Sequence, residues 1–200
     1  MDWIAVSLKN DVPPGVVVPS RIDNTDLAIW CTDSGTYHAW SDRCPHRGMR
    51  LSHGFVRGDA LACIYHGWQY NETGSCKYIP AHPQLSPPET ICVPTYACTE
   101  SGGVIWVALA KPAEAPPDLS GREAIRSMPV GMSAAHIAAS FGATGDTVLT
   151  IGSDFDVVLA LQPCAEDYCV MHALAAPGHD RKHVSRWLEE MRSTLEDTAI

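Results

Sequence analysis

The chain has 200 residues, which is enough for one compact domain and a smaller second unit and excludes a large multidomain catalyst. Apolar residues make up 46% of it, so the chain can bury a core and wholesale disorder is excluded. Its 14 basic and 23 acidic residues give a net charge of −9, which is the wrong sign for binding nucleic acid or an anionic membrane.

The eight cysteines indicate either a disulfide framework or metal and redox chemistry, depending on the compartment. Residues 1–20 begin with Met-Asp and contain no basic segment, twin arginine or long apolar run, so no export signal is visible. The longest apolar run, residues 104–110, is too short to cross a bilayer. We therefore expect a cytoplasmic protein with mostly reduced thiols and no membrane partner.

Residues 1–110 are a series of short β-leaning runs divided by turn signals such as Asp33-Ser34-Gly35. No apolar pattern of helical period and length occurs among them. The pattern predicts antiparallel sheet, with strands at residues 4–8, 16–18, 27–31, 36–40, 60–65, 68–70 and 104–109.

A proline-rich segment, residues 111–120, is typical of a linker or wrapping segment. We therefore expect two units, residues 1–110 and residues 121–200, on either side of it. In the second unit we expect a short helix at residues 133–141 and strands at residues 147–151, 156–161 and 168–174.

The chain closes with a segment in which apolar residues recur at helical spacing after Asp180, a candidate helix cap. This stripe consists of Val184, Trp187, Leu188, Met191 and Leu195. The second unit is thus predicted to be a small α+β region that ends in an amphipathic helix.

Two short motifs carry the chemistry. Residues 44–48 are Cys-Pro-His-Arg-Gly, and residues 63–68 are Cys-Ile-Tyr-His-Gly-Trp. Each motif places a thiol and an imidazole in a tight, glycine-containing loop, and the 16 residues between His46 and Cys63 suffice for a strand and a return. Two thiolates with two imidazoles suit either tetrahedral zinc or a two-iron cluster with cysteines on one iron and histidines on the other.

The order Cys, His, Cys, His favours the cluster, because zinc-finger pairs usually place like ligands together. By these motifs, residues 1–110 resemble the Rieske [2Fe-2S] family, which implies a mostly β fold with a Rieske-type antiparallel β-sandwich. The resemblance also implies that Cys44 and Cys63 hold the inner iron of a [2Fe-2S] cluster, while His46 and His66 hold the outer, redox-active iron.

Within that family, the two loops resemble the oxygenases and their ferredoxins, because they lack the extra cysteines and the serine of the respiratory-complex members. Neutral imidazoles in place of two thiolates make such centres easier to reduce than all-cysteine ones. Since few hydroxyl donors are expected near the sulfurs, we expect a midpoint potential at the low end of the Rieske range, about −150 mV.

A complete Rieske oxygenase also has a mononuclear iron site, for which the family motif is an acidic residue, two residues, His, four residues, His. No two histidines after residue 70 have that spacing. The end of the chain nevertheless loosely resembles the last strands and final helix of such a catalytic domain, which implies a reduced cap without the iron helix.

An unorthodox second metal site would use His172, His179 and His183, of which the last two are one helical turn apart. The plainer interpretation is a solvated helix start. Further histidines expected at the surface or at the edge of the core are His38, His53, His82 and His136.

The other cysteines lack paired ligand spacing, so we expect small buried apolar residues or exposed thiols. They are Cys31, Cys76, Cys92, Cys98, Cys164 and Cys169, the last two with a redox pair as a remote alternative. Arg47 either faces an acidic partner or braces its loop. Tyr65 and Trp68 are expected to shield the centre, and Tyr65 is a candidate hydrogen-bond donor toward it.

These features favour an electron-transfer protein that takes single electrons from an NAD(P)H-dependent reductase and delivers them to a non-haem iron oxygenase component. Its acidic surface would suit a basic docking patch on the partner. This function requires partly exposed histidines, His46 and His66, above buried cysteines. The sequence is compatible with an oligomer.

Two alternatives belong to other classes. One is a Rieske oxygenase subunit that itself takes part in hydroxylation or demethylation of a small molecule, with an unrecognised or partner-supplied mononuclear iron. The other is a structural module that binds zinc through the same four residues.

Overall fold

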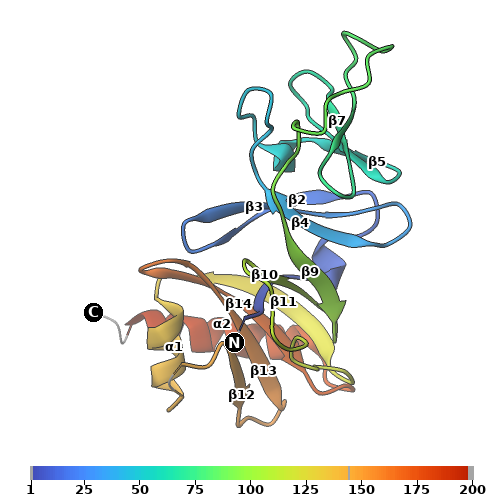
Figure 1. The fold of residues 1–200 in the computed structure, drawn as a ribbon. Coiled ribbons are helices and arrows are strands. Elements are labelled where there is room, and N and C mark those ends of the chain that lie inside the picture. The colour runs from blue at the N-terminus through green and yellow to red at the C-terminus, as the bar shows by residue number, and fades with distance from the viewer. Residues whose placement is uncertain (1, 144, 198–200) are drawn as a thin grey trace.

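The structure, a computed structural model, describes residues 2–143 and 145–197. Within these residues the strands form three antiparallel sheets, one six-stranded and two four-stranded. In Figure 1, a small sheet with β5 (Phe55–Arg57) and β7 (Gln69–Asn71) lies at one end, the six-stranded sheet in the middle and the C-terminal unit at the other end. The predicted mostly β, antiparallel architecture is confirmed.

The six-stranded sheet, of order β1-β10-β9-β4-β3-β2, is the centre of the first unit. All of β10 is buried, because Ile105 points into a core within the first unit while Trp106 packs against residues of the C-terminal unit. The strands are β1 (Ile4–Leu8), β2 (Val17–Ile22), β3 (Thr25–Cys31), β4 (Tyr37–Ser41), β9 (Thr95–Ser101) and β10 (Val104–Ala108).

The smaller sheet, of order β5-β6-β7-β8, is formed by short hairpins beyond β4. Its other strands are β6 (Ala60–Ala62) and β8 (Cys76–Tyr78). Gly54, just before β5, allows a close approach of two backbones, since a Cβ there would lie 2.3 Å from the carbonyl oxygen of Ala62. Two short 3₁₀ turns, η1 (Lys9–Asp11) and η2 (Leu51–His53), complete the first unit.

The C-terminal unit is a sheet of order β11-β14-β13-β12 with two helices packed on one face. The cap predicted at Asp180 is confirmed, because its Oδ1 accepts a hydrogen bond of 2.9 Å from the N–H of Lys182. The elements are β11 (Glu123–Val130), α1 (Ala134–Ser140), β12 (Val148–Ile151), β13 (Val157–Ala165), β14 (Tyr168–Ala175) and the closing amphipathic α2 (Arg181–Asp197). Among the described residues, no helix is long and apolar enough to span a membrane.

The other face of the C-terminal sheet packs on the first unit. Val158 and Leu174 join Trp106 in one apolar cluster. Residues 111–120, which contain no helix or strand, run along this junction, and Leu119 is buried in the same cluster. The two units therefore share a core.

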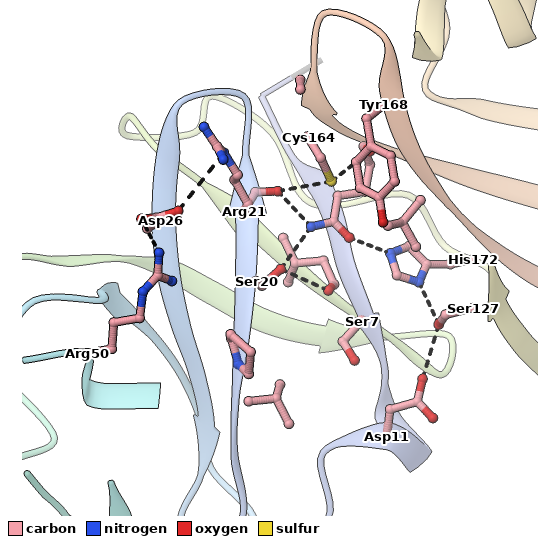
Figure 2. Close-up of a pocket in the computed structure, with 16 residues that line it drawn as sticks. Ser7, Asp11, Ser20, Arg21, Asp26, Arg50, Ser127, Cys164, Tyr168 and His172 are labelled. Atoms are coloured by element: carbon pink, nitrogen blue, oxygen red, sulfur yellow. Dashed lines mark hydrogen bonds and ion pairs between the residues drawn. The ribbon is translucent and has the colours of Figure 1, made fainter. Parts of the chain in front are cut away.

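A pocket of about 600 Å³ lies beside this apolar junction, between β2 and the hairpin of β13 and β14 (Figure 2). The side-chain NH₂ of Gln162 donates a hydrogen bond of 2.7 Å to the carbonyl of Arg21. The side-chain oxygen of Gln162 accepts a hydrogen bond of 3.0 Å from Nε2 of His172. The other ring nitrogen of His172 lies 2.9 Å from Oγ of Ser127, which lies 3.1 Å from a carboxylate oxygen of Asp11. A buried histidine thus links the two units through both of its nitrogens.

Several strands lie where the sequence predicts them, with shifts of one to a few residues at their ends. The prediction at residues 60–65 is too long, because the strand ends at Ala62 and the chain then turns into the second motif. Four strands were not predicted, namely β5, β8, β9 and β11. The division into residues 1–110 and 121–200 stays a prediction.

The buried histidine makes stability depend on pH. Burial lowers the pKa of His172 from 6.5 to about 4. Between these pH values the unfolded chain binds a proton at this ring that the folded chain does not, so stability is lost as the pH falls through the window, by about 3 kcal/mol at its lower end. His172→Gln should remove this loss, measured by urea unfolding at pH 7 and pH 4.5. The exposed His136→Gln should retain it, and equal slopes in both variants would contradict the assignment.

Candidate metal centre

The first motif forms a loop after β4 that is closed on its own cysteine. The N–H of Cys44 donates to the carbonyl of Met49 at 2.8 Å, and the carbonyl of Cys44 accepts from the N–H of Gly48 at 2.8 Å. Gly48 has a φ of +72°, in the left-handed region that glycine adopts without strain. Both backbone groups of Cys44 are therefore fixed within the loop.

The second motif, between β6 and β7, repeats this arrangement. The N–H of Cys63 donates to the carbonyl of Trp68 at 2.9 Å, and the carbonyl of Cys63 accepts from the N–H of Gly67 at 3.0 Å. Gly67 has a φ of +70°, and a Cβ there would lie 3.0 Å from Cγ of Pro80. Glycine is thus required here both for its conformation and for space.

The two loops bring together the four side chains singled out in the sequence. Cys44 and Cys63 are 3% and 2% exposed, His46 is half-buried and His66 is exposed. The two imidazole rings meet edge to face with their centroids 4.6 Å apart. The expected arrangement, thiols inside and imidazoles at the surface, is the one observed.

The surroundings of the thiols favour a metal-bound thiolate. Burial, above all, and the neighbouring Cys44 thiol raise the pKa of Cys63, so without a metal this thiol stays protonated at neutral pH. The backbone N–H groups of Tyr65 and His66 donate to the Cys63 sulfur and lower that pKa. Backbone donors that face the sulfur stabilise its negative charge once a metal has displaced the proton.

The sulfur of Cys44 is contacted by the hydroxyl of Tyr70, a residue the sequence analysis did not single out. Tyr70 is fully buried, and its Oη lies 3.1 Å from Sγ of Cys44. Burial, and next the bond to Cys44, raise the pKa of Tyr70, so its hydroxyl keeps its proton and donates it. Tyr65 is 55% exposed and its backbone N–H reaches Cys63, while the hydrogen bond expected from its hydroxyl stays a prediction.

Two aromatic rings flank the imidazoles. Trp68 stacks on His46 with 4.2 Å between ring centroids and 5° between the planes. Tyr65 lies against His66 at 4.0 Å. Burial, the neighbouring His66 and the charge of Arg47 together lower the pKa of His46, which favours the neutral imidazole that a metal requires.

The base of the first loop is held by a buried carboxylate. Asp42 is 0% exposed and accepts two hydrogen bonds of 2.7 Å, from the N–H and the hydroxyl of Ser52. The guanidinium of Arg50 lies 3.2 Å from the carboxylate of Asp42 and 2.9 Å from that of Asp26, so it bridges the two. This fully paired charge fixes the chain between β4 and the first cysteine.

The proposed alternative site around His172 is not assembled. Both nitrogens of His172 are engaged in the network of Figure 2, on the sheet face that packs on the first unit. His179 and His183 instead contact Phe155, which packs with the core under the helices on the opposite face. The structure therefore separates the three histidines. Of the remaining ones, His38 stacks on Trp30, and His53, His82 and His136 are exposed.

The six other cysteines are spread over several parts of the structure, and Cys31 and Cys98 share one apolar cluster. Cys31, Cys76, Cys164 and Cys169 are buried, Cys98 is half-buried and Cys92 is exposed. Cys164 and Cys169 take part in hydrogen bonds on different faces of their hairpin, Cys164 toward the carbonyl of Arg21 and Cys169 within the core under the helices. Cys76 packs in the same apolar cluster as Cys44, and burial, above all, raises its pKa.

Comparison with known proteins identifies the first unit. Residues 2–97 match the family model of the Rieske [2Fe-2S] domain. "Oxidoreductase NdmD" of Pseudomonas putida is 40% identical over 111 residues, which are 55% of this chain and 19% of that protein. "Methylxanthine N1-demethylase NdmA" of the same species is 45% identical over 73 residues, which are 36% of this chain and 21% of that protein. The chain thus spans about a fifth of the length of these relatives.

Solved structures extend the likeness to the C-terminal unit. NdmA of Pseudomonas putida CBB5 matches with a TM-score of 0.77 over 99% of this chain and 80% of that one, at 18% identity. The apo form of dicamba monooxygenase matches with a TM-score of 0.73 over 98% and 85%, also at 18% identity. At this identity the likeness shows the fold alone.

The contact of Tyr70 with Cys44 leads to a prediction about redox potential. The reduced centre carries one more negative charge, and a hydroxyl donor to sulfur stabilises it. Tyr70→Phe should therefore lower the midpoint potential, by about 40 mV for each kcal/mol of hydrogen bond lost. A dye-mediated redox titration measures the shift. Tyr78→Phe, which alters an exposed ring on β8, is the control, and a potential unchanged in both variants would contradict the role of Tyr70.

Proposed function

This chain belongs to the Rieske [2Fe-2S] family, whose domain it carries at residues 2–97, and from this we propose that it transfers single electrons from an NAD(P)H-dependent reductase to a non-haem iron oxygenase component. The family carries a Rieske-type [2Fe-2S] cluster, which accepts and releases one electron at a time. We assign its ligands as Cys44, Cys63, His46 and His66. The expected cytoplasmic location is part of this proposal.

One observation carries the proposal: the imidazoles are the accessible side of the centre. The two thiols are buried below 4% exposure, whereas His66 is exposed and His46 half-exposed, so a partner can approach the histidine side only. The two loops that carry these histidines, after β4 and before β7, lie toward the end of the molecule opposite the C-terminal unit (Figure 1). The C-terminal unit therefore leaves the electron path open.

The protein's own residues perform three tasks in this function. The twin backbone loops hold the cysteines in fixed positions, so little rearrangement accompanies a change of charge. Tyr70 and the N–H groups of Tyr65 and His66 stabilise negative charge on the sulfurs. The free ring nitrogen of each histidine can hold or release a proton at the surface, which links electron transfer to pH.

The alternative, an oxygenase subunit with its own mononuclear iron, is less well supported. Its candidate histidines are split between two faces of the C-terminal sheet, with His172 on one and His179 and His183 on the other. The resemblance of the whole chain to oxygenase structures concerns the fold alone.

The proposal is tested by the metal content and spectrum of the purified protein. We expect about two irons and two acid-labile sulfides per chain, with the low-temperature EPR signal of mixed histidine and cysteine ligation after reduction by dithionite. A third iron, together with oxygen consumption by the isolated protein, would instead support the oxygenase. One zinc without sulfide would overturn both.

The ligand assignment is tested at the exposed histidine. His66→Cys adds a thiolate to the outer iron, so the midpoint potential should fall by about 100 mV or the cluster should be lost. His82→Cys, an exposed position in the neighbouring loop, is the matched control and should change neither potential nor spectrum. An unchanged spectrum in the His66 variant would remove it from the ligand set.

A further inference from the structure

The charge around the exposed histidines differs in sign from that of the whole chain. Residues 43–50, 63–68 and 79–88, which lie in the two ligand loops and the loop beside them, contain three arginines and no aspartate or glutamate, and the exposed Glu89 follows in the third loop. The chain as a whole carries a net charge of −9. The other acidic residues therefore lie elsewhere in the sequence.

Two of these arginines are already paired. Arg50 binds Asp26 at 2.9 Å and Asp42 at 3.2 Å, and Arg43 approaches Asp26 at 3.8 Å. Arg47 is exposed, and none of the ion pairs or hydrogen bonds found among residues 2–143 and 145–197 includes its side chain. It directly follows His46 in the first ligand loop. Of the two roles considered for Arg47, a brace within the loop is therefore the less well supported.

Apolar surface surrounds the same edge. Ile64 and Tyr65 are 49% and 55% exposed, in the middle of the second ligand loop. The two imidazoles, together with Trp68, Ile79 and Pro80, also line a groove of about 490 Å³. Exposed apolar residues beside a single unpaired cation are typical of a protein docking surface.

We propose that this edge docks on an acidic face of its electron-transfer partner, with Arg47 meeting a carboxylate and an apolar side chain of the partner entering the groove. The proposal rests on the proposed function and names the chemistry of the partner. It reverses the expectation from net charge, which favoured a basic patch on the partner. Local charge guides docking because charges more than about 10 Å from the contact are largely screened at 0.1 M salt.

The local charge can be measured without knowing the partner, by oxidising the reduced protein with two cobalt(III) complexes of opposite charge. In each reaction one electron passes from the protein to cobalt(III), which becomes cobalt(II). The probes are the anionic EDTA complex and the cationic tris(phenanthroline) complex, followed by stopped-flow absorbance in 0.1 M salt. The ratio of the two rates cancels, to first order, a change in the driving force of a variant.

Arg47→Glu should lower the anionic-to-cationic rate ratio by about threefold to tenfold, and Arg47→Gln by a smaller factor. The matched control is Arg57→Glu, which makes the same charge change at another exposed arginine. Arg57 pairs with Ala60 at the turn of the β5–β6 hairpin, whereas Cys63 follows the opposite end of that hairpin, after Ala62. The control should change the ratio by less than about twofold, because its charge is screened. Ile64→Glu, which leaves Arg47 in place, should also lower the ratio.

The outcomes separate this proposal from the proposed function. Equal ratios in the Arg47 and Arg57 variants, or a wild-type ratio that increases with added salt, would overturn the acidic-partner proposal while the protein still exchanges electrons. A protein that assembles its cluster and reacts with neither complex would overturn the proposed function itself. Midpoint potentials and visible spectra of all variants verify that the centre is intact. A lowered ratio at Arg47 and Ile64, but not at Arg57, supports the proposal.

Discussion

The centre depends on a backbone constraint: each ligand loop returns to its own cysteine. In both loops the cysteine N–H bonds the carbonyl five residues later, and its carbonyl bonds the glycine N–H four residues later. The histidine is the second residue after Cys44 in one loop and the third after Cys63 in the other, yet the rings meet at 4.6 Å. The same backbone frame thus holds each thiol in the interior and accepts a histidine at either position. The two motifs can therefore differ in the spacing between cysteine and histidine.

This frame is useful only because it is anchored on a rigid support. The cysteines pack in the cluster of Trp30, Trp40 and Tyr70, and the buried carboxylate of Asp42 fixes the chain that enters the first loop. The C-terminal unit lies away from this support and packs against β1, β2 and β10 through an apolar junction and the network around His172. It can therefore stabilise the first unit without covering the histidine edge.

The sequence predicts what depends on local patterns and misses what depends on contacts. The twin motifs, the closing helix and its Asp180 cap are local patterns, and the buried run of β10 is apolar throughout. Strand β11 was missed because it contains Pro129 and only two of its eight positions are buried, so its pairing with β14 decides its structure. Tyr70 and Asp42 were missed because nothing in a single sequence shows which hydroxyl reaches a thiol, or which carboxylate is buried and paired.

The sign of the charge at the histidine edge illustrates the same limit. Net charge describes the long-range field, but at physiological salt that field decays over about 8 Å. The C-terminal unit lies at the far end of the molecule in Figure 1, so its carboxylates contribute little where the imidazoles are exposed. Asp26 and Asp42 lie nearer, but they are already paired, Asp42 with Arg50 and Asp26 with Arg50, Arg43 and Arg21. The unpaired, exposed Arg47 directly follows His46, so in the docking we propose an overall negative protein presents a positive, partly apolar edge to its partner.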